Sequence, residues 1–193
     1  MNRLLIANRG EIAIRIARAA TDMGLATVAV YSEDDANSLH LRVTDEAQAL
    51  PGQGAAAYLN MDSVIAAAKA SGCDAVHPGY GFLAERGDFA RACADAGLTF
   101  VGPQVKHLEL FGDKARARQA AAAASVPVIR GLNHAITLAE AKDFFASLGS
   151  SGAMIIKALA GGGGRGTRVV LTTEEIEPTF ERCLLYTSDA ADE

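Results

Sequence analysis

Residues 4–19 read LLIANRGEIAIRIARA, in which a strand-like run passes through a short turn into an amphipathic helix. The apolar run Leu4–Ala7 is typical of a buried strand, and Glu11–Met23 has helical spacing and ends before Gly24. A second strand-like run, Thr27–Tyr31, follows directly. A strand, a helix and a second strand in this order favour a parallel pair of strands with the helix packed on one face.

The alternation of strands and helices continues to about residue 110. Further strand-like runs are Ala47–Leu50, Ala75–His77 and Thr99–Val101, and further helix-like runs are Asp62–Ala70 and Leu83–Ala96. Ligands of such sheets bind outside the carboxyl ends of the strands. We therefore predict an α/β fold that begins with a Rossmann-like parallel sheet, helices covering both faces.

The turn after the first strand is not a dinucleotide-binding fingerprint. A GxGxxG motif needs three glycines, and Asn8–Ala13 supplies only Gly10. Glu11 would also place a negative charge at the helix start, where a pyrophosphate should lie. Arg9 and Glu11 are better interpreted as a turn residue and a helix-start acid favoured by the helix dipole. We therefore do not expect NAD or FAD to bind here.

A segment rich in glycine and aromatic residues, HPGYGFL, occupies His77–Leu83 after another predicted strand. Such a loop can hold a planar ring against Tyr80 or Phe82, and Gly81 can bring backbone N–H groups close to a ligand. The alternative is a tight turn with buried aromatic side chains, and this segment alone leaves both interpretations open.

The pattern changes after Pro103, and we place a domain boundary near Gly112. Predicted elements beyond Pro103 are the helices Val105–Phe111, Asp113–Ala124 and Leu138–Leu148 and the strand Val126–Ile129. Asp113 is a good helix N-cap residue. Lys114 is not favoured by the dipole in the first turn, so it either acts with the helix end on an anion or is a plain exposed lysine. The first domain is predicted at 1–112 and the second at 113–182.

Gly161–Gly166 reads GGGGRG and lies between two strand-like runs, Met154–Lys157 and Arg168–Leu171. A P-loop would read GxxxxGK[ST] and open a helix, so this loop instead indicates a hairpin with a flap at its tip. Its N–H groups can fold over phosphate oxygens, with Arg165 and Lys157 as cations beside them. The alternative is an ordinary surface hairpin.

Composition excludes several classes of protein. The chain has 193 residues, half of them apolar, and a net charge of −5, so we expect neither nucleic-acid binding nor a membrane span. The N-terminus does not have the form of a secretory signal. The three cysteines and four histidines show no spacing typical of a zinc site or a disulfide framework. We predict a reducing, cytoplasmic location and no metal site in this chain.

The last residues do not fit the helix that we expect to start at Thr173. Cys183–Glu193 reads CLLYTSDAADE, which resembles translated sequencing-adapter sequence and does not continue the apolar stripe. We predict that 183–193 is a foreign or disordered tail. The alternative is a natural frayed terminus.

Five segments together resemble the biotin carboxylase family, the ATP-grasp component of biotin-dependent acyl-CoA, pyruvate and urea carboxylases. They are LLIANRGEIAIRIARA, AVHPGYGFLAERGDFA, TFVGP, FGDKARAR and MIIKALAGGGGRG, in the family's order and spacing. The resemblance runs from Asn2 to Glu181 and covers less than half of a complete family member. It implies a Rossmann-like first domain without dinucleotide function, followed by an incomplete ATP-grasp domain.

The same resemblance implies a reaction and its participants. ATP activates bicarbonate as carboxyphosphate, and the carboxyl group then moves to biotin on a carrier. Motif position implies that Lys114 and Lys157 contact the ATP phosphates, and that Tyr80 and Gly81 lie at the biotin end of the site. The flap that closes on ATP would contain Gly163, Gly164, Arg165 and Gly166. The implied partners are a biotin carboxyl carrier domain or protein and a carboxyltransferase, and a homodimer is compatible with the resemblance.

The chain departs from the family pattern at Thr167, where Met is usual, and at Ala160, where some members have another glycine. The family's Mg²⁺-binding carboxylates, bicarbonate-binding basic residues and catalytic arginine lie beyond Glu181, so we expect this fragment to be inactive. Two alternatives stay open. One is another ATP-grasp ligase of the carboxylate–amine or carbamoyl-phosphate type, which should lack the HPGYGF and NRGEIA strings. The other is a non-enzymatic nucleotide-binding module.

Overall fold

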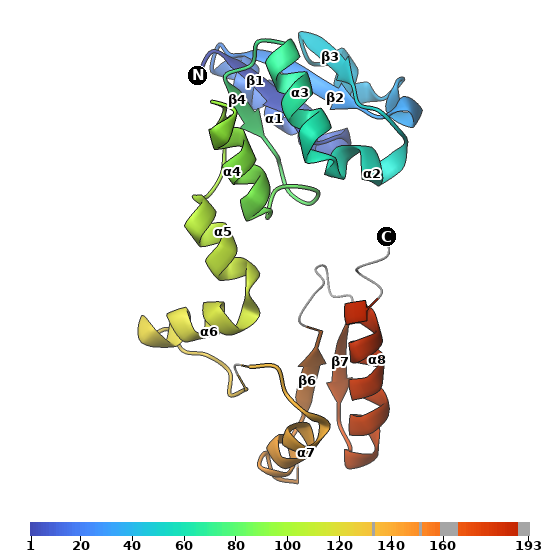
Figure 1. The fold of residues 1–193 in the computed structure, drawn as a ribbon, viewed down its shortest axis with the longest axis vertical. Helices are drawn as coiled ribbons and strands as arrows, with labels where there is room; N and C mark the ends of the chain where they lie inside the picture. Colours follow the sequence, from blue (N-terminus) through green and yellow to red (C-terminus); the bar gives the residue numbers. More distant parts are fainter. Residues whose placement is uncertain (133, 151, 159–165, 189–193) are drawn as a thin grey trace. The chain divides into compact units, whose positions relative to one another are not determined.

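The computed structural model describes residues 1–132, 134–150, 152–158 and 166–188. The chain divides into two compact units, Met1–Gly112 and Asp113–Glu193. Figure 1 colours the first unit from blue to yellow-green and the second from yellow to red.

The first unit is built on a parallel five-stranded sheet of order β3-β2-β1-β4-β5. Its strands are β1 (Arg3–Ile6), β2 (Ala26–Tyr31), β3 (Glu46–Ala49), β4 (Ala75–His77) and β5 (Thr99–Phe100). In register, Leu5 of the central strand β1 lies between Val28 of β2 and Val76 of β4. The predicted α/β class with a Rossmann-like parallel sheet is therefore confirmed.

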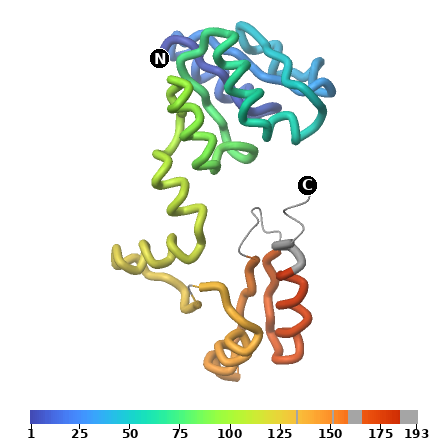
Figure 2. The backbone as a smooth tube through the Cα atoms, viewed as in Figure 1, coloured from blue at the N-terminus to red at the C-terminus, as the bar shows by residue number. Residues whose placement is uncertain are grey.

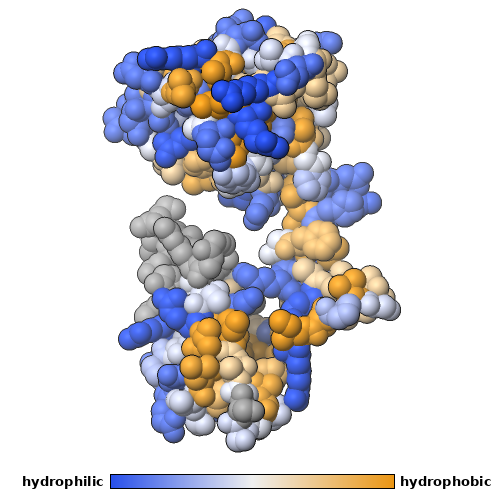
Figure 3. Space-filling model, turned by 180° about the vertical axis from the view of Figure 1, so that it is seen from behind, coloured by the Kyte–Doolittle hydropathy of each residue, from blue (hydrophilic) through white to orange (hydrophobic). Residues whose placement is uncertain are grey.

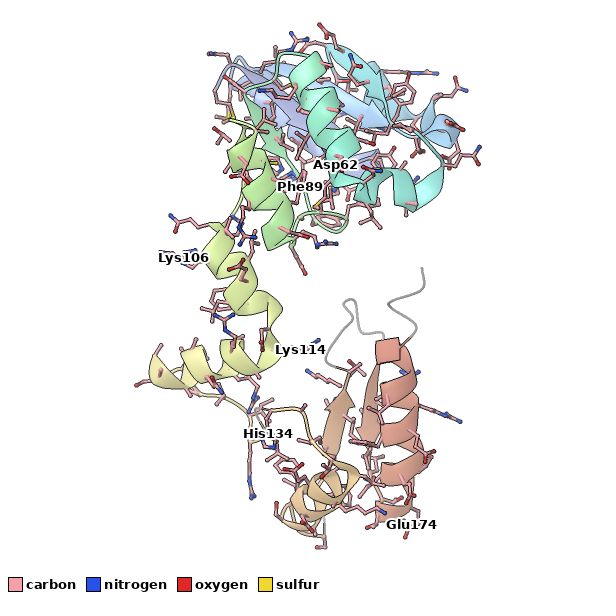
Figure 4. All side chains as sticks on the ribbon, viewed as in Figure 1. Asp62, Phe89, Lys106, Lys114, His134 and Glu174 are labelled. Atoms are coloured by element: carbon pink, nitrogen blue, oxygen red, sulfur yellow. The ribbon has the colours of Figure 1, made fainter. Side chains whose placement is uncertain are left out.

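Helices cover both faces of this sheet (Figure 1). They are α1 (Gly10–Asp22), α2 (Gly54–Leu59), α3 (Met61–Ala70) and α4 (Gly87–Asp95), with α5 (Val105–Gly112) following β5. Because side chains alternate along a strand, Leu4 and Ile6 pack with alanines of α1, whereas Leu5 faces the core formed with α2, α3 and α4. Phe89 of α4 is a fully buried member of that core (Figure 4).

Two elements of the first unit differ from the sequence prediction. The helix predicted at 83–96 begins only at Gly87, because Phe82 has a φ of +42° and the residues after it form turns. Leu83 is fully buried in this loop rather than on a helix. Helix α2 was not predicted, since its six residues, GAAAYL, are too few to show a helical period.

The second unit contains helices and an antiparallel strand pair. Its elements are α6 (Lys114–Ala123), α7 (Leu138–Ala146), β6 (Met154–Lys157), β7 (Thr167–Val170), the short 3-10 helix η3 (Thr173–Glu175) and α8 (Ile176–Ser188). The pairing of Met154 with Val170 and Lys157 with Thr167 confirms the predicted antiparallel hairpin. A small core joins one face of the hairpin to α7 and α8.

Two predictions for the second unit are wrong. Val126–Ile129 is not a strand, and Ile129 is 86% exposed, because this segment has no strand to pair with in the described structure. Residues 183–188 do not form the predicted disordered tail, since α8 continues to Ser188 and Cys183 is buried in the hairpin core. A foreign origin of 183–193 stays a prediction. The backbone tube of Figure 2 shows this helix beside the hairpin. No helix in the described ranges has both the length and the apolar character needed to cross a membrane.

Candidate functional site

The ligand-side edge of the first unit lies at the carboxyl ends of its parallel strands. Asn8 and Arg9 lie after β1, Ser32 follows β2, and the segment that starts at Pro78 follows β4. Parallel strands place all these loops at one edge of the sheet. This edge therefore holds two of the sequence motifs, NRGE and HPGYGF, next to each other.

Side-chain hydrogen bonds join the two motifs. The Asn8 amide Nδ2 donates to the carbonyl oxygens of Pro78 at 2.8 Å and Tyr80 at 2.9 Å. The Tyr80 hydroxyl donates to Glu11 Oε1 at 2.8 Å, and this bond raises the pKa of Tyr80. Asn8 is only 3% exposed, so its bonds are shielded from water.

The predicted biotin-side residues lie on the outer part of this loop. Tyr80 is 65% exposed. Gly81 has a φ of +71° and faces open space, with nothing within 4 Å of the position that a Cβ would take. Burial lowers the pKa of His77, whose Nδ1 accepts a hydrogen bond from the Gly79 N–H at 3.0 Å. The structure thus leaves Tyr80 and Gly81 accessible at the ligand-side edge, and their role stays a prediction.

A network of charged and polar side chains, formed by Arg9, Asp35 and Tyr58, was not predicted. Arg9 Nη1 forms an ion pair with Asp35 at 2.7 Å, and the Tyr58 hydroxyl donates to the same carboxylate at 2.8 Å. Burial alone would raise the pKa of Asp35, but hydrogen bonds from Arg9, Tyr58 and Ser38 hold this pKa at about 2. Burial and the bond to Asp35 raise the pKa of Tyr58 to about 12. Sequence spacing carries no signal for this network, since its members come from three separate segments.

In the second unit, Lys114 begins helix α6 and reaches the hairpin. Asp113 caps the helix, and its carboxylate accepts N–H bonds from Ala115 and Arg116. Lys114 Nζ donates to the carbonyl oxygen of Ala158 at 3.3 Å, directly after the end of β6. Figure 4 shows this side chain extending from the start of α6 toward the hairpin. One predicted phosphate-binding lysine therefore lies at the base of the glycine loop.

The second predicted lysine, Lys157, is the last residue of β6 and its side chain is exposed. Side chains alternate along β6, so Lys157 shares the outer face of the hairpin with Ile155, whose cross-strand partner is Val169. These two apolar residues are 55% and 58% exposed. The outer face of the hairpin therefore combines an apolar surface with a cation at its loop end.

Gly166 closes the described part of the hairpin. It has a φ of +72°, and its carbonyl oxygen accepts a bond from the Ala158 N–H at 2.9 Å. The Cys183 thiol also reaches this oxygen, at 3.4 Å. The other predicted flap residues, Gly163, Gly164 and Arg165, lie outside the described residues.

The described residues provide neither a cluster of metal ligands nor an exposed thiol. Within the described ranges, no group of three or more His, Cys, Asp or Glu side chains could hold a metal ion. All three cysteines are buried and free, and burial raises the pKa of Cys93 to about 11.

These two units correspond to a Rossmann-like domain and part of an ATP-grasp domain. The family model for the biotin carboxylase N-terminal domain matches residues 1–108. The model for the ATP-binding domain of the carbamoyl-phosphate synthase L chain matches residues 113–192. The chain belongs to the biotin carboxylase family.

Curated relatives and solved structures agree with this assignment. Mitochondrial pyruvate carboxylase of Rattus norvegicus is 50% identical over 186 residues, which are 94% of this chain and 16% of that protein. Biotin carboxylase 1 of Bacillus subtilis is 46% identical over 91% of this chain and 39% of its own length. The 2-oxoglutarate carboxylase biotin carboxylase domain dimer of Hydrogenobacter thermophilus, solved with MgADP, ADP and bicarbonate, has a TM-score of 0.86 and 40% identity, covering 94% of this chain and 40% of that one. The chain thus spans well under half of the relatives it matches.

Proposed function

We propose that this chain is the N-terminal part of a biotin carboxylase, a ligase that uses ATP and bicarbonate to carboxylate biotin on a carrier. The observation that carries the proposal is the placement of Lys114 and Lys157 at the loop end of an antiparallel hairpin. The hairpin follows a Rossmann-like domain of the same family. The ADP and bicarbonate bound to the Hydrogenobacter relative support the same ligands here.

The outer face of the hairpin suits a nucleotide. Exposed Ile155 and Val169 offer an apolar surface to a purine ring, and Lys157 at the loop end offers a cation to the phosphates. Lys114, from the start of α6, adds a second cation near the same loop. Phosphoryl transfer depends mainly on positioning and charge neutralisation, to which the two lysines would contribute. The flap residues Gly163, Gly164, Arg165 and Gly166 would close over the phosphates and exclude water from a labile intermediate.

Magnesium is implied by the family, but the described residues do not offer a set of carboxylates that fits it. No step is therefore assigned to a metal held by this chain. The residues present bind and neutralise the nucleotide, and the metal ligands, like the catalytic residues, would lie in the rest of the carboxylase. On this basis we expect the 193-residue chain alone to be inactive.

The biotin end of the site is proposed at Tyr80 and Gly81. The exposed Tyr80 ring offers a face or edge to the bicyclic ring of biotin, and the open space at Gly81 lets a ligand approach the backbone. A biotin carrier and a carboxyltransferase are the proposed partners, with a homodimer as the proposed assembly and the cytoplasm as the proposed location. Residues 1–112 and 113–182 stay our proposed domain limits, and 183–193 our proposed foreign segment.

A second candidate is a ligase of the carbamoyl-phosphate synthase type, because the second unit matches that ATP-binding domain. The first unit argues against it, since residues 1–108 match the biotin carboxylase N-terminal domain. A non-enzymatic nucleotide-binding module is the third candidate. Product analysis separates all three, because only the proposed function gives carboxybiotin.

The test uses the complete carboxylase that contains this chain. We expect ADP formation that depends on bicarbonate and on a biotinylated carrier. Lys157→Ala should lower kcat/KM for ATP by about 10²–10³-fold, the usual effect of losing one preorganised electrostatic group. Lys106→Ala is the matched control, since Lys106 is an exposed lysine of α5, and it should leave the kinetics unchanged. Equal behaviour of the two variants would contradict the phosphate role of Lys157.

A further inference from the structure

The NRGE turn, Asn8–Glu11, has no part in the nucleotide chemistry described above. We propose that Asn8 is a positioning residue that fixes the shape of the loop 77–82, and that Glu11 fixes the direction of the Tyr80 ring. The proposal rests on the proposed function for the identity of the ligand, biotin. It assigns a task to a motif that has none in the proposed nucleotide site.

The Asn8 side chain uses both its hydrogen-bond donors and its acceptor. Its two amide protons go to two carbonyl oxygens, Pro78 at 2.8 Å and Tyr80 at 2.9 Å. Its own oxygen accepts the Arg9 N–H at 2.9 Å. The two acceptor residues flank Gly79 and lie about 70 residues from Asn8 in sequence. An amide is suited to this position, because an aspartate would place an oxygen without a proton where Nδ2 donates to both carbonyls, and an alanine would leave both without a donor.

The loop closes tightly around this amide at Gly79. Its φ is +68°, and a Cβ on Gly79 would lie 2.6 Å from Asn8 Nδ2 and 2.7 Å from Ile12 Cγ2. Only glycine combines this backbone conformation with this close approach. The shape of the loop is therefore complementary to the Asn8 side chain.

Glu11 acts on the part of the loop that faces solvent. Tyr80 is 65% exposed, so packing constrains its ring only weakly. The hydrogen bond from its hydroxyl to Glu11 Oε1 at 2.8 Å sets the direction of the ring. Glu11 thus orients the side chain that we place beside biotin.

The same turn also stabilises the far end of the loop. The Phe82 ring packs against the Tyr58 ring at 5.1 Å between centroids. The Tyr58 hydroxyl donates a hydrogen bond to Asp35, and the same carboxylate forms an ion pair with Arg9 at 2.7 Å. Phe82 keeps a φ of +42°, a conformation that a large side chain adopts only where its surroundings impose it. Residues of one turn therefore hold the loop at its start, at its middle and, through Tyr58, at its end.

Hydrogen exchange on this chain tests the positioning role directly. Asn8→Asp should speed exchange of the Gly79–Phe82 amides at least tenfold, including the Gly79 N–H that is bound to His77, and leave β2 amides unchanged. Asn37→Asp, the same substitution at an exposed asparagine, should change neither region. If the Gly79–Phe82 amides of Asn8→Asp exchanged at the wild-type rate, the proposal would be overturned.

A second pair of variants covers the case in which Asn8→Asp fails to fold. Glu11→Ala removes the acceptor for the Tyr80 hydroxyl, whereas Glu11→Gln keeps an acceptor oxygen at the same place. We expect Glu11→Ala to alter the Tyr80 ring signals in NMR spectra and Glu11→Gln to restore them. Identical Tyr80 signals in Glu11→Ala and the wild type would overturn the assignment of Glu11.

Kinetics of the complete carboxylase connect the turn to biotin. Asn8→Asp and Glu11→Ala should raise KM for biotin at least tenfold and leave KM for ATP within twofold of the wild type. A wild type that makes no carboxybiotin would refute the proposed function and leave the exchange result standing. A wild type that makes carboxybiotin, with KM for biotin unchanged in both variants, would overturn the link between the turn and biotin.

Discussion

The two units differ in how their sheets are covered. In the first unit both faces of the sheet are buried, one against α1 and the other against α2, α3 and α4. In the second unit α7 and α8 cover one face of the hairpin, and the other face exposes Ile155 and Val169. Figure 3 shows hydrophobic residues on the surface of the second unit. The first unit therefore carries a loop fixed by buried hydrogen bonds, whereas the second leaves apolar side chains exposed on one face of its hairpin.

The largest expected effect tests whether the units are stable independently. Phe89 is fully buried and meets Phe100 edge to face at 5.9 Å. Phe89→Ala should cost the first unit about 3–5 kcal/mol of unfolding free energy through lost burial and a cavity. Denaturation followed by unit-resolved hydrogen exchange should show no change in the second unit. Phe111→Ala, at a residue 66% exposed, is the control and should cost less than about 0.5 kcal/mol. Equal loss in both units would show that they unfold together.

The charged network of the first unit gives the next effect, which depends on pH. The pKa of Asp35 is about 2 in the folded chain, against an ordinary value of 3.8. The folded carboxylate is thus favoured, and its contribution is present above about pH 4 and is lost as pH falls toward 2. The pKa difference corresponds to at most about 2 kcal/mol.

Acid denaturation of wild type and Asp35→Asn measures this contribution. The first unit of Asp35→Asn should be less stable at pH 6 and should lose less stability than the wild type between pH 4 and pH 2. Parallel curves for the two proteins would show that the Arg9–Asp35 pair adds nothing to stability.

A smaller effect in the second unit comes from a helix cap. Thr137 Oγ1 accepts the Glu140 N–H at 3.2 Å, and Glu140 accepts the Thr137 N–H at 2.7 Å, a capping box at the start of α7. Thr137→Ala should cost the second unit about 1 kcal/mol, measured by urea denaturation. Thr137→Ser keeps the hydroxyl and should recover most of the loss. A Thr137→Ser variant as unstable as Thr137→Ala would mean that methyl packing, and not the cap, matters there.

The difference in burial between the two units also explains which elements could be predicted from the sequence. The first-unit strands and α1 were predicted because their apolar spacing reflects burial of the sheet and of one helix face. The strand at Val126–Ile129 was predicted from β-branched residues alone, and such residues form a strand only where a partner strand is present. Burial of Cys183 was missed because its packing against the hairpin depends on tertiary contacts that the apolar pattern does not show.

The candidate site was predictable only in part, for a similar reason. Tyr80 and Gly81 stood out because a glycine- and aromatic-rich loop follows a strand, and Lys157 because it precedes a glycine run. The role of Asn8 was not visible, since its partners lie about 70 residues away and local sequence does not record such contacts. The Asp35 carboxylate was missed in the same way.

The smallest expected effect on stability is that of Val169→Thr. Val169 and Val170 are adjacent in β7 and point to opposite faces of the hairpin. Val170 is fully buried against α7 and α8, whereas Val169 is 58% exposed. Val170→Thr places a hydroxyl in the core and should cost the second unit about 1–3 kcal/mol. Val169→Thr makes the same chemical change on the outer face and should alter stability by less than about 0.5 kcal/mol in urea denaturation. In the complete carboxylase, Val169→Thr should instead weaken ATP binding severalfold, because the purine would lose an apolar contact. If Val169→Thr destabilised the unit as much as Val170→Thr, the outer face would already be covered by protein, and the nucleotide would have to bind elsewhere.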